Sequence, residues 1–123
     1  MLKGKPTIDM RTKLLLACIF LLAALLRFYN INWDNGNLFH PDERNIANAV
    51  STITLFSQMD PKFYAYGGFL IYLYKFSADI LAILLNNPAI AHDWCLINVI
   101  GRSYSAFFSV MTIFPLYFLA AKV

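Results

Sequence analysis

Charged residues are scarce in this chain of 123 residues. Asp, Glu, Lys and Arg together make up 14% of the sequence, whereas 59% of the residues are hydrophobic. Soluble globular domains carry roughly 25% charged and 45–50% apolar residues. A chain this short leaves much of its surface exposed when it folds, so it could not bury so much apolar surface in water. The composition excludes an ordinary soluble domain and predicts an all-α integral membrane protein with the lipid bilayer as a partner.

Cysteine and clustered metal ligands are also scarce. The two cysteines, Cys18 and Cys95, both lie in or beside apolar runs. A disulfide could join them, but two buried small hydrophobic side chains are the favoured interpretation. No CxxC pair and no Cys/His cluster with zinc spacing occurs in the sequence, so we expect no metal site and no cofactor. The basic residues are scattered rather than interleaved with aromatic residues, which argues against a nucleic-acid partner.

Three hydrophobic runs predict three transmembrane helices, over residues 14–33, 67–85 and 96–121. A crossing needs roughly 20 helical residues. The uncharged centre of the first run is shorter, but its flanking basic side chains can reach the headgroups and an aromatic belt that includes Trp33 lies beyond it. A cleaved signal peptide is the alternative, and the lack of a small-residue cleavage site favours a retained helix. Pro115 predicts a kink in the third run.

Basic residues predict how these helices are oriented. Four of them crowd the N-terminus: Lys3, Lys5, Arg11 and Lys13. Cytoplasmic segments are enriched in Lys and Arg, so we expect residues 1–13 to be cytoplasmic, residues 34–66 to form an external loop and residues 86–95 to form an internal linker. We expect a multi-pass protein of a prokaryotic cytoplasmic membrane rather than of the endoplasmic reticulum.

A few charges interrupt the hydrophobic runs. Lys75 and Asp79 are four residues apart, so they share a helix face and should form a buried structural ion pair. Arg102 lies near the start of the third run, where we expect it to anchor the helix to lipid headgroups.

The predicted external loop carries most of the polar chemistry. Residues 34–36 (DNG) have the composition of a tight turn. An amphipathic helix is predicted over about residues 43–57 and should lie along the membrane interface. Its apolar face consists of Ile46, Ala49, Val50, Ile53 and Phe56.

Asp42 and Glu43 stand at the start of that helix, after Pro41. One interpretation is structural: Asp42 caps the helix and Glu43 favours the positive end of the helix dipole. The other is catalytic, because a carboxylate beside a membrane can remove the proton from an acceptor hydroxyl. His40 alone is more typical of a loop residue that makes one hydrogen bond.

Several segments resemble the start of the dolichyl-phosphate-mannose–protein mannosyltransferase-like family, glycosyltransferase family 39 of the GT-C membrane superfamily. They are residues 39–44 (FHPDER) preceded by residues 26–34 (LRFYNINWD), residues 61–67 (PKFYAYG) and residues 101–106 (GRSYSA). The resemblance covers nearly the whole chain but only the first quarter or so of such an enzyme. We therefore expect an N-terminal fragment of a GT-C type helix bundle that is inactive alone.

The resemblance implies a function for particular residues. Asp42 matches the general base that acts on the acceptor, and Glu43 matches the acidic neighbour that positions the acceptor or tunes Asp42. His40, Arg44 and Tyr66, from the matched segments, are the candidate substrate-binding residues. The donor would be a sugar on polyprenyl or dolichyl phosphate, and the acceptor a protein, lipid or glycan. Two alternatives stay open: a small three-helix scaffold or partner subunit, and a transporter fragment whose polar residues would lie within the spans.

Overall fold

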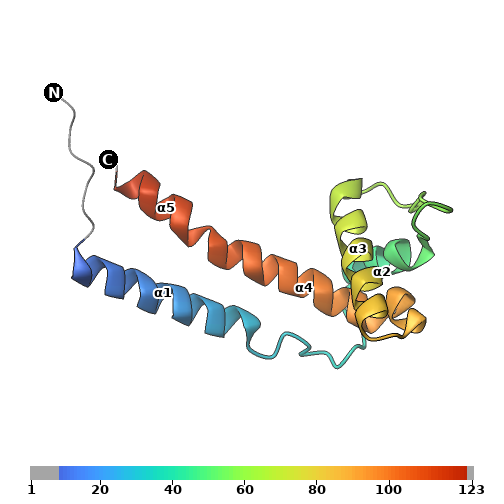
Figure 1. Ribbon diagram of the computed structural model, residues 1–123, viewed down its shortest axis with the longest axis horizontal. Helices are drawn as coiled ribbons and strands as arrows, with labels where there is room; N and C mark the ends of the chain where they lie inside the picture. Colours follow the sequence, from blue (N-terminus) through green and yellow to red (C-terminus); the bar gives the residue numbers. More distant parts are fainter. Residues whose placement is uncertain (1–8, 122–123) are drawn as a thin grey trace. The chain divides into compact units, whose positions relative to one another are not determined.

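The computed structural model describes residues 9–121 (Figure 1). Its elements are the helices α1 (Met10–Phe28), α2 (Pro41–Thr52), α3 (Gly68–Leu84), the short 3₁₀ helix η1 (Pro88–His92), α4 (Trp94–Met111) and α5 (Ile113–Ala120). Within this part of the chain the only extended pairing is one isolated bridge between Thr54 and Gln58. The expected all-α class is confirmed. Lys3 and Lys5, two of the four basic residues that predict the orientation, lie outside the described residues.

The helices divide into two compact units. The first unit contains α1, the last turns of α4 from Ala106 onward, and α5. Within it, α1 and α5 lie side by side and run in opposite directions (Figure 1). The ring centroids of Phe20 and Phe114 are 5.3 Å apart, and the Arg27 Nε donates a hydrogen bond to the Ser109 hydroxyl. The first unit is therefore an antiparallel pair of helices.

Residues beside both ends of α1 explain where the helix begins and ends. Asp9 caps it by accepting a hydrogen bond from the backbone N–H of Thr12 at 3.1 Å, and neither Pro nor Gly interrupts the helix. The helix ends at Phe28, and Asn30 then adopts a left-handed conformation with φ +50°. The helix thus ends five residues before the end of the predicted 14–33 span.

The run of α4 and α5 is interrupted at Thr112, one turn before Pro115. Because proline has no backbone N–H, it cannot donate to the carbonyl four residues earlier, so the predicted distortion is present. Taken together, Trp94–Ala120 is the one helix in the described part of the chain that is long and apolar enough to cross a membrane. Three spans are therefore not confirmed: α1 carries three basic residues within its 19 residues, and α3 has only 17.

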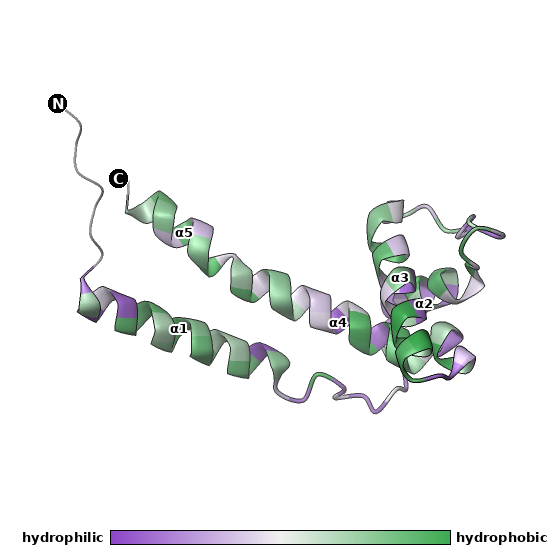
Figure 2. Ribbon diagram, viewed as in Figure 1, coloured by the Kyte–Doolittle hydropathy of each residue, from purple (hydrophilic) through white to green (hydrophobic). Residues whose placement is uncertain are grey.

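Large apolar side chains cover the surface of the first unit. Neither α1 nor α5 contains a buried residue, and hydrophobic residues succeed one another along both helices (Figure 2). The most exposed of those in α1 and α5 are Met10, Leu14, Leu15, Leu21, Leu25, Leu26, Leu116 and Leu119. Cys18 is also exposed and both cysteines are free, so the expectation that Cys18 is buried was wrong. Apolar surface this extensive marks a contact with lipid or with more protein.

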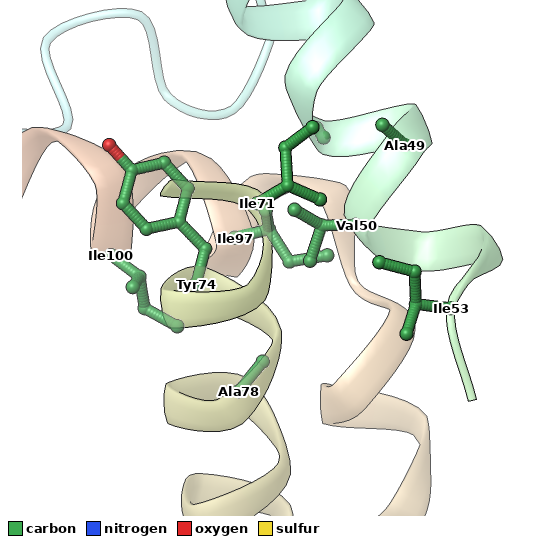
Figure 3. Close-up of a cluster of buried hydrophobic side chains, with 9 residues drawn as sticks. Ala49, Val50, Ile53, Ile71, Tyr74, Ala78, Ile97 and Ile100 are labelled. Atoms are coloured by element: carbon green, nitrogen blue, oxygen red, sulfur yellow. The ribbon is translucent and has the colours of Figure 1, made fainter. Parts of the chain in front are cut away.

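The second unit, residues 30–105, has a core of its own (Figure 3). Its buried residues come from α2 and the residue directly after it, from α3 and from the first turns of α4: Ala47, Ala49, Val50, Ile53, Ile71, Tyr74, Ala78, Ile97 and Ile100. The predicted apolar face of α2 is therefore real, but other helices cover it. Phe56 is exposed and does not belong to this face. Because the other members pack in the core, the expectation that the face rests on the membrane interface was wrong.

The amphipathic helix ends at Thr52 rather than near residue 57. In its last turn the hydroxyls of Ser51 and Thr52 donate to the carbonyls of Asn48 and Ala49, each at 2.8 Å. Such hydroxyl bonds compete with helix continuation. Phe56, four residues beyond the end, has φ +67° and is 97% exposed.

Lys75 and Asp79 form the predicted ion pair, with 2.8 Å between Lys75 Nζ and Asp79 Oδ1. Lys75 is buried, and its ammonium also donates to the Ala91 carbonyl of η1 at 3.2 Å. The pair is accounted for by helix packing, which is the structural role that was expected.

The start of α4 and the η1 helix lie against the end of α2. Ring Nδ1 of His92 is 2.6 Å from the Ser51 carbonyl oxygen, and Trp94 Nε1 donates to the Ser51 hydroxyl at 3.0 Å. Residues 34–66 and 86–95 were expected on opposite sides of a membrane. These contacts place them together in one packed unit, so a single crossing by α3 between them does not agree with the structure.

Core packing in the second unit gives a first prediction. Ile53 is fully buried, so Ile53→Ala should lower the free energy of unfolding by about 2–5 kcal/mol through lost burial and the cavity left behind. Phe56→Ala, three residues further on, should change it by less than about 0.5 kcal/mol because Phe56 makes almost no contact. Thermal or denaturant unfolding of the purified protein in detergent measures both, and equal effects would contradict the described end of α2.

Candidate active site

Arg102 of α4 is the centre of the polar cluster in the second unit. Its guanidinium donates to both carboxylate oxygens of Asp34, from Nη1 to Oδ1 at 3.0 Å and from Nη2 to Oδ2 at 2.8 Å. It also donates to Glu43, from Nε to Oε1 at 3.0 Å and from Nη2 to Oε2 at 2.7 Å, and to the Ile31 carbonyl at 3.0 Å. Each pairing to a carboxylate is two-pronged, the geometry in which arginine binds most strongly. Arg102 is thus not a simple headgroup anchor.

Asp34 organises the loop before α2. The predicted turn is confirmed, since Asn37 N–H donates to the Asp34 carbonyl at 3.0 Å and Gly36 has φ +80°. The Asp34 side chain is fully buried and accepts from the backbone N–H groups of Gly36 and Leu38 at 3.2 and 3.1 Å. Hydrogen bonds from the Arg102 guanidinium hold the pKa of the Asp34 carboxyl below its ordinary value. Asp34 is therefore an ionised anchor rather than a surface turn residue.

Glu43 faces the same guanidinium from the first turn of α2. Its Oε2 also accepts from Asn98 Nδ2 at 3.3 Å. The hydrogen bonds from Arg102 lower the pKa of the Glu43 carboxyl. A carboxylate held in this way is a poor proton acceptor, because protonation would break charge-assisted bonds. Of the two predicted catalytic residues, Glu43 fits the positioning role and not the role of base.

Asp42 does not cap α2. The cap is His40, whose Nδ1 accepts a hydrogen bond from the Asp42 backbone N–H at 3.3 Å, which requires the neutral imidazole with its proton on Nε2. The interpretation of Asp42 as the cap of the helix was therefore wrong, because His40 is the cap. The side chains of His40 and Asp42 are 59% and 52% exposed, with 3.8 Å between His40 Nδ1 and Asp42 Oδ2. The Asp42 carboxylate is left open to an incoming molecule.

Tyr66 reaches Asp42 from the end of the loop that precedes α3. The neighbouring Asp42 carboxylate raises the pKa of the Tyr66 phenol. Arg44 is exposed in the first turn of α2, and none of the polar contacts in the described residues involves its side chain. The structure therefore brings together three of the predicted site residues, His40, Asp42 and Tyr66. It holds Glu43 in the Arg102 cluster and leaves Arg44 outside both groups.

Two residues of the site, Arg102 and Asp34, were not identified from the sequence. A sequence signal did exist, because an arginine in an otherwise uncharged helix needs a partner, and the loop carries an excess of carboxylates. The Arg102 guanidinium also lies over the indole of Trp33, 5.1 Å from its centroid. Among the described residues no three His, Cys, Asp or Glu side chains are grouped so that they could hold a metal ion.

The Arg102 cluster gives a prediction with a defined sign. Because folding lowers the pKa of Asp34 and Glu43, their stabilisation is complete above the ordinary carboxyl values of 3.8 and 4.5 and is lost as pH falls below them. The melting temperature should therefore drop on acidification from pH 6 to about 3. In Arg102→Met two carboxylates lack their counterion, so folding raises their pKa and acidification should restore stability.

Arg44→Met, which removes an exposed guanidinium from the same unit, serves as the control and should have the wild-type pH profile. Thermal melts monitored by circular dichroism in detergent measure all three proteins. A wild-type-like profile for Arg102→Met would contradict the assignment of Asp34 and Glu43 as its partners.

Comparison with known proteins adds nothing to this geometry: no protein-family model matches the chain, and neither the curated proteins nor the solved structures gave a significant match.

Proposed function

We propose that this chain is the N-terminal part of a multi-pass membrane glycosyltransferase, which transfers a sugar from a polyprenyl- or dolichyl-phosphate donor to an acceptor at the external face. The proposal is supported by the segments that resemble glycosyltransferase family 39 and by one observation about the site. Asp42 and Glu43 are neighbours in the sequence, yet Glu43 is held by Arg102 while the Asp42 carboxylate stays exposed beside His40 and Tyr66.

Asp42 is the general base in this proposal. The acceptor hydroxyl loses its proton to the Asp42 carboxylate as its oxygen bonds to the anomeric carbon of the sugar. The bond between that carbon and the phosphate oxygen breaks, and the lipid phosphate leaves with the electron pair. Removing a proton in this way accelerates such steps by typically 10²–10⁴-fold. Glu43 and Arg102 fix the first turn of α2, and the His40 cap leaves Asp42 free to act.

The membrane placement rests on the two-unit structure. We place α1 and the α4–α5 helix across the bilayer in opposite directions, with the segment between them on the external side. The exposed leucines of α1 and α5 can contact lipid chains. The basic residues Arg11 and Lys13 favour a cytoplasmic location for the start of α1. A third crossing over residues 67–85 is left out, because η1 packs against the end of α2.

Topology gives a prediction that separates two crossings from three. In a protein whose native cysteines are replaced by alanine, Asn37→Cys and Asn87→Cys should both react with a membrane-impermeant thiol reagent added outside intact cells. Both side chains are exposed. Three crossings would leave Asn87→Cys unlabelled until the membrane is permeabilised, and an unlabelled Asn37→Cys would reverse the orientation.

Catalysis is tested in the complete enzyme that contains this segment. Asp42→Asn keeps the size of the side chain but removes its basicity, so transfer should fall by about 10²–10⁴-fold while binding of the lipid-linked sugar is kept. Asp93→Asn is the matched control. Asp93 accepts the Leu96 N–H at 2.8 Å at the start of α4, and asparagine caps helices equally well, so activity should be unchanged.

Turnover is measured as transfer of radiolabelled sugar, and folding by the melting temperature of each variant. Near-wild-type turnover in Asp42→Asn would exclude Asp42 as the base. If the complete protein transferred no sugar at all, the scaffold alternative would take precedence.

A further inference from the structure

Two aromatic rings stand exposed next to the candidate site. Trp33 is 54% and Phe39 64% exposed, and their ring centroids are 6.0 Å apart. The Arg102 guanidinium covers one face of the Trp33 indole. Much of the exposed area must therefore belong to the rest of that ring, and the Phe39 ring, inclined to it by 41°, extends this aromatic surface.

Buried neighbours hold both rings in place. Trp33 directly precedes the buried Asp34, and Phe39 is preceded by Leu38, which is 6% exposed. Leu38 has φ +51°, a left-handed conformation that is costly for a branched side chain, and its N–H is bonded to the Asp34 carboxylate. Strained backbone of this kind persists only where the surroundings enforce it, and it is concentrated at ligand sites. The burial of Leu38 and the bond from its N–H to Asp34 thus hold the backbone before Phe39, whose ring stays exposed.

Polar residues with planar side-chain groups stand close to Trp33 and Phe39 in the sequence. Asn35, His40 and Asp42 are all exposed on the same short stretch of chain. A pyranose ring presents two kinds of surface, a face of C–H groups and an edge of hydroxyls. Aromatic rings match the first, while amide, imidazole and carboxylate groups match the second.

We propose that Trp33 and Phe39 form a platform on which a hexose ring stacks, with its hydroxyls directed to Asn35, His40 and Asp42. This assigns the sugar of the donor, rather than its lipid chain, to the Trp33–Phe39 platform. The inference deepens the proposed function, because the stacked sugar is the one transferred near Asp42, but its test measures binding and not catalysis. An acyl or isoprenoid chain fits less well, because it would cover His40 and Asp42 without replacing their hydrogen bonds to water.

Saturation-transfer NMR of the purified chain in detergent tests the platform. The probes are the methyl glycosides of mannose, glucose and galactose, together with farnesyl phosphate, which has the lipid and phosphate but no sugar. At least one glycoside should receive saturation, most strongly on its ring C–H protons. Trp33→Leu should weaken its binding by roughly tenfold or more, whereas Trp33→Tyr should retain most of it.

Trp94→Leu is the matched control and should bind the glycoside like the wild type, since Trp94 lies at the opposite end of α2, against Ser51. Far-ultraviolet circular dichroism shows whether each variant is folded, and Trp33→Tyr keeps the test valid if Trp33→Leu is not. Binding of none of the glycosides, or equal loss in the two leucine variants, would overturn the proposal. If farnesyl phosphate received saturation and this depended on Trp33, the platform would bind the lipid chain instead of the sugar. That result would also overturn the proposal.

Discussion

The guanidinium of Arg102 is the interaction on which the second unit depends. It joins three segments far apart in the sequence: the middle of α4, the loop after α1 and the first turn of α2. Two carboxylates face one guanidinium, so the cluster carries excess negative charge. The backbone N–H groups of Gly36 and Leu38 and the amide of Asn98 donate to those carboxylates and compensate for it. A partly buried arginine is tolerable here because its Nε, Nη1 and Nη2 groups all donate hydrogen bonds.

The same cluster explains why adjacent acidic residues have different roles. Successive residues on a helix point about 100° apart. Once Glu43 is fixed toward Arg102, Asp42 must point away from it, into the space shared with His40 and Tyr66. The cap supplied by His40 is equally important, because a capping Asp42 would have its carboxylate occupied by backbone N–H groups. One helix start thus provides a carboxylate held as an anchor and another that is exposed.

Local signals in the sequence were enough to predict the helices, the turn at Asp34 and the Lys75–Asp79 pair, because each depends on residues close in the chain. The partners of Arg102 could not be predicted, since they lie 59 and 68 positions away. The span predicted over residues 67–85 is not confirmed, for a different reason. One side of α3 is apolar because Ile71, Tyr74 and Ala78 pack on α2 and α4, and hydropathy cannot distinguish side chains buried in protein from side chains that face lipid.

The length of α4 and α5 indicates how the site would be held relative to the bilayer in the proposed arrangement. Beyond Arg102, residues 103–120 contain no charge, and their 18 positions span about 27 Å at 1.5 Å per residue. The hydrocarbon core of a bilayer is about 30 Å thick. The uncharged length is close to this thickness, so in the proposed arrangement Arg102 would lie at the edge of the hydrocarbon core. Through its bonds to Glu43, Arg102 also fixes the first turn of α2, which carries Asp42.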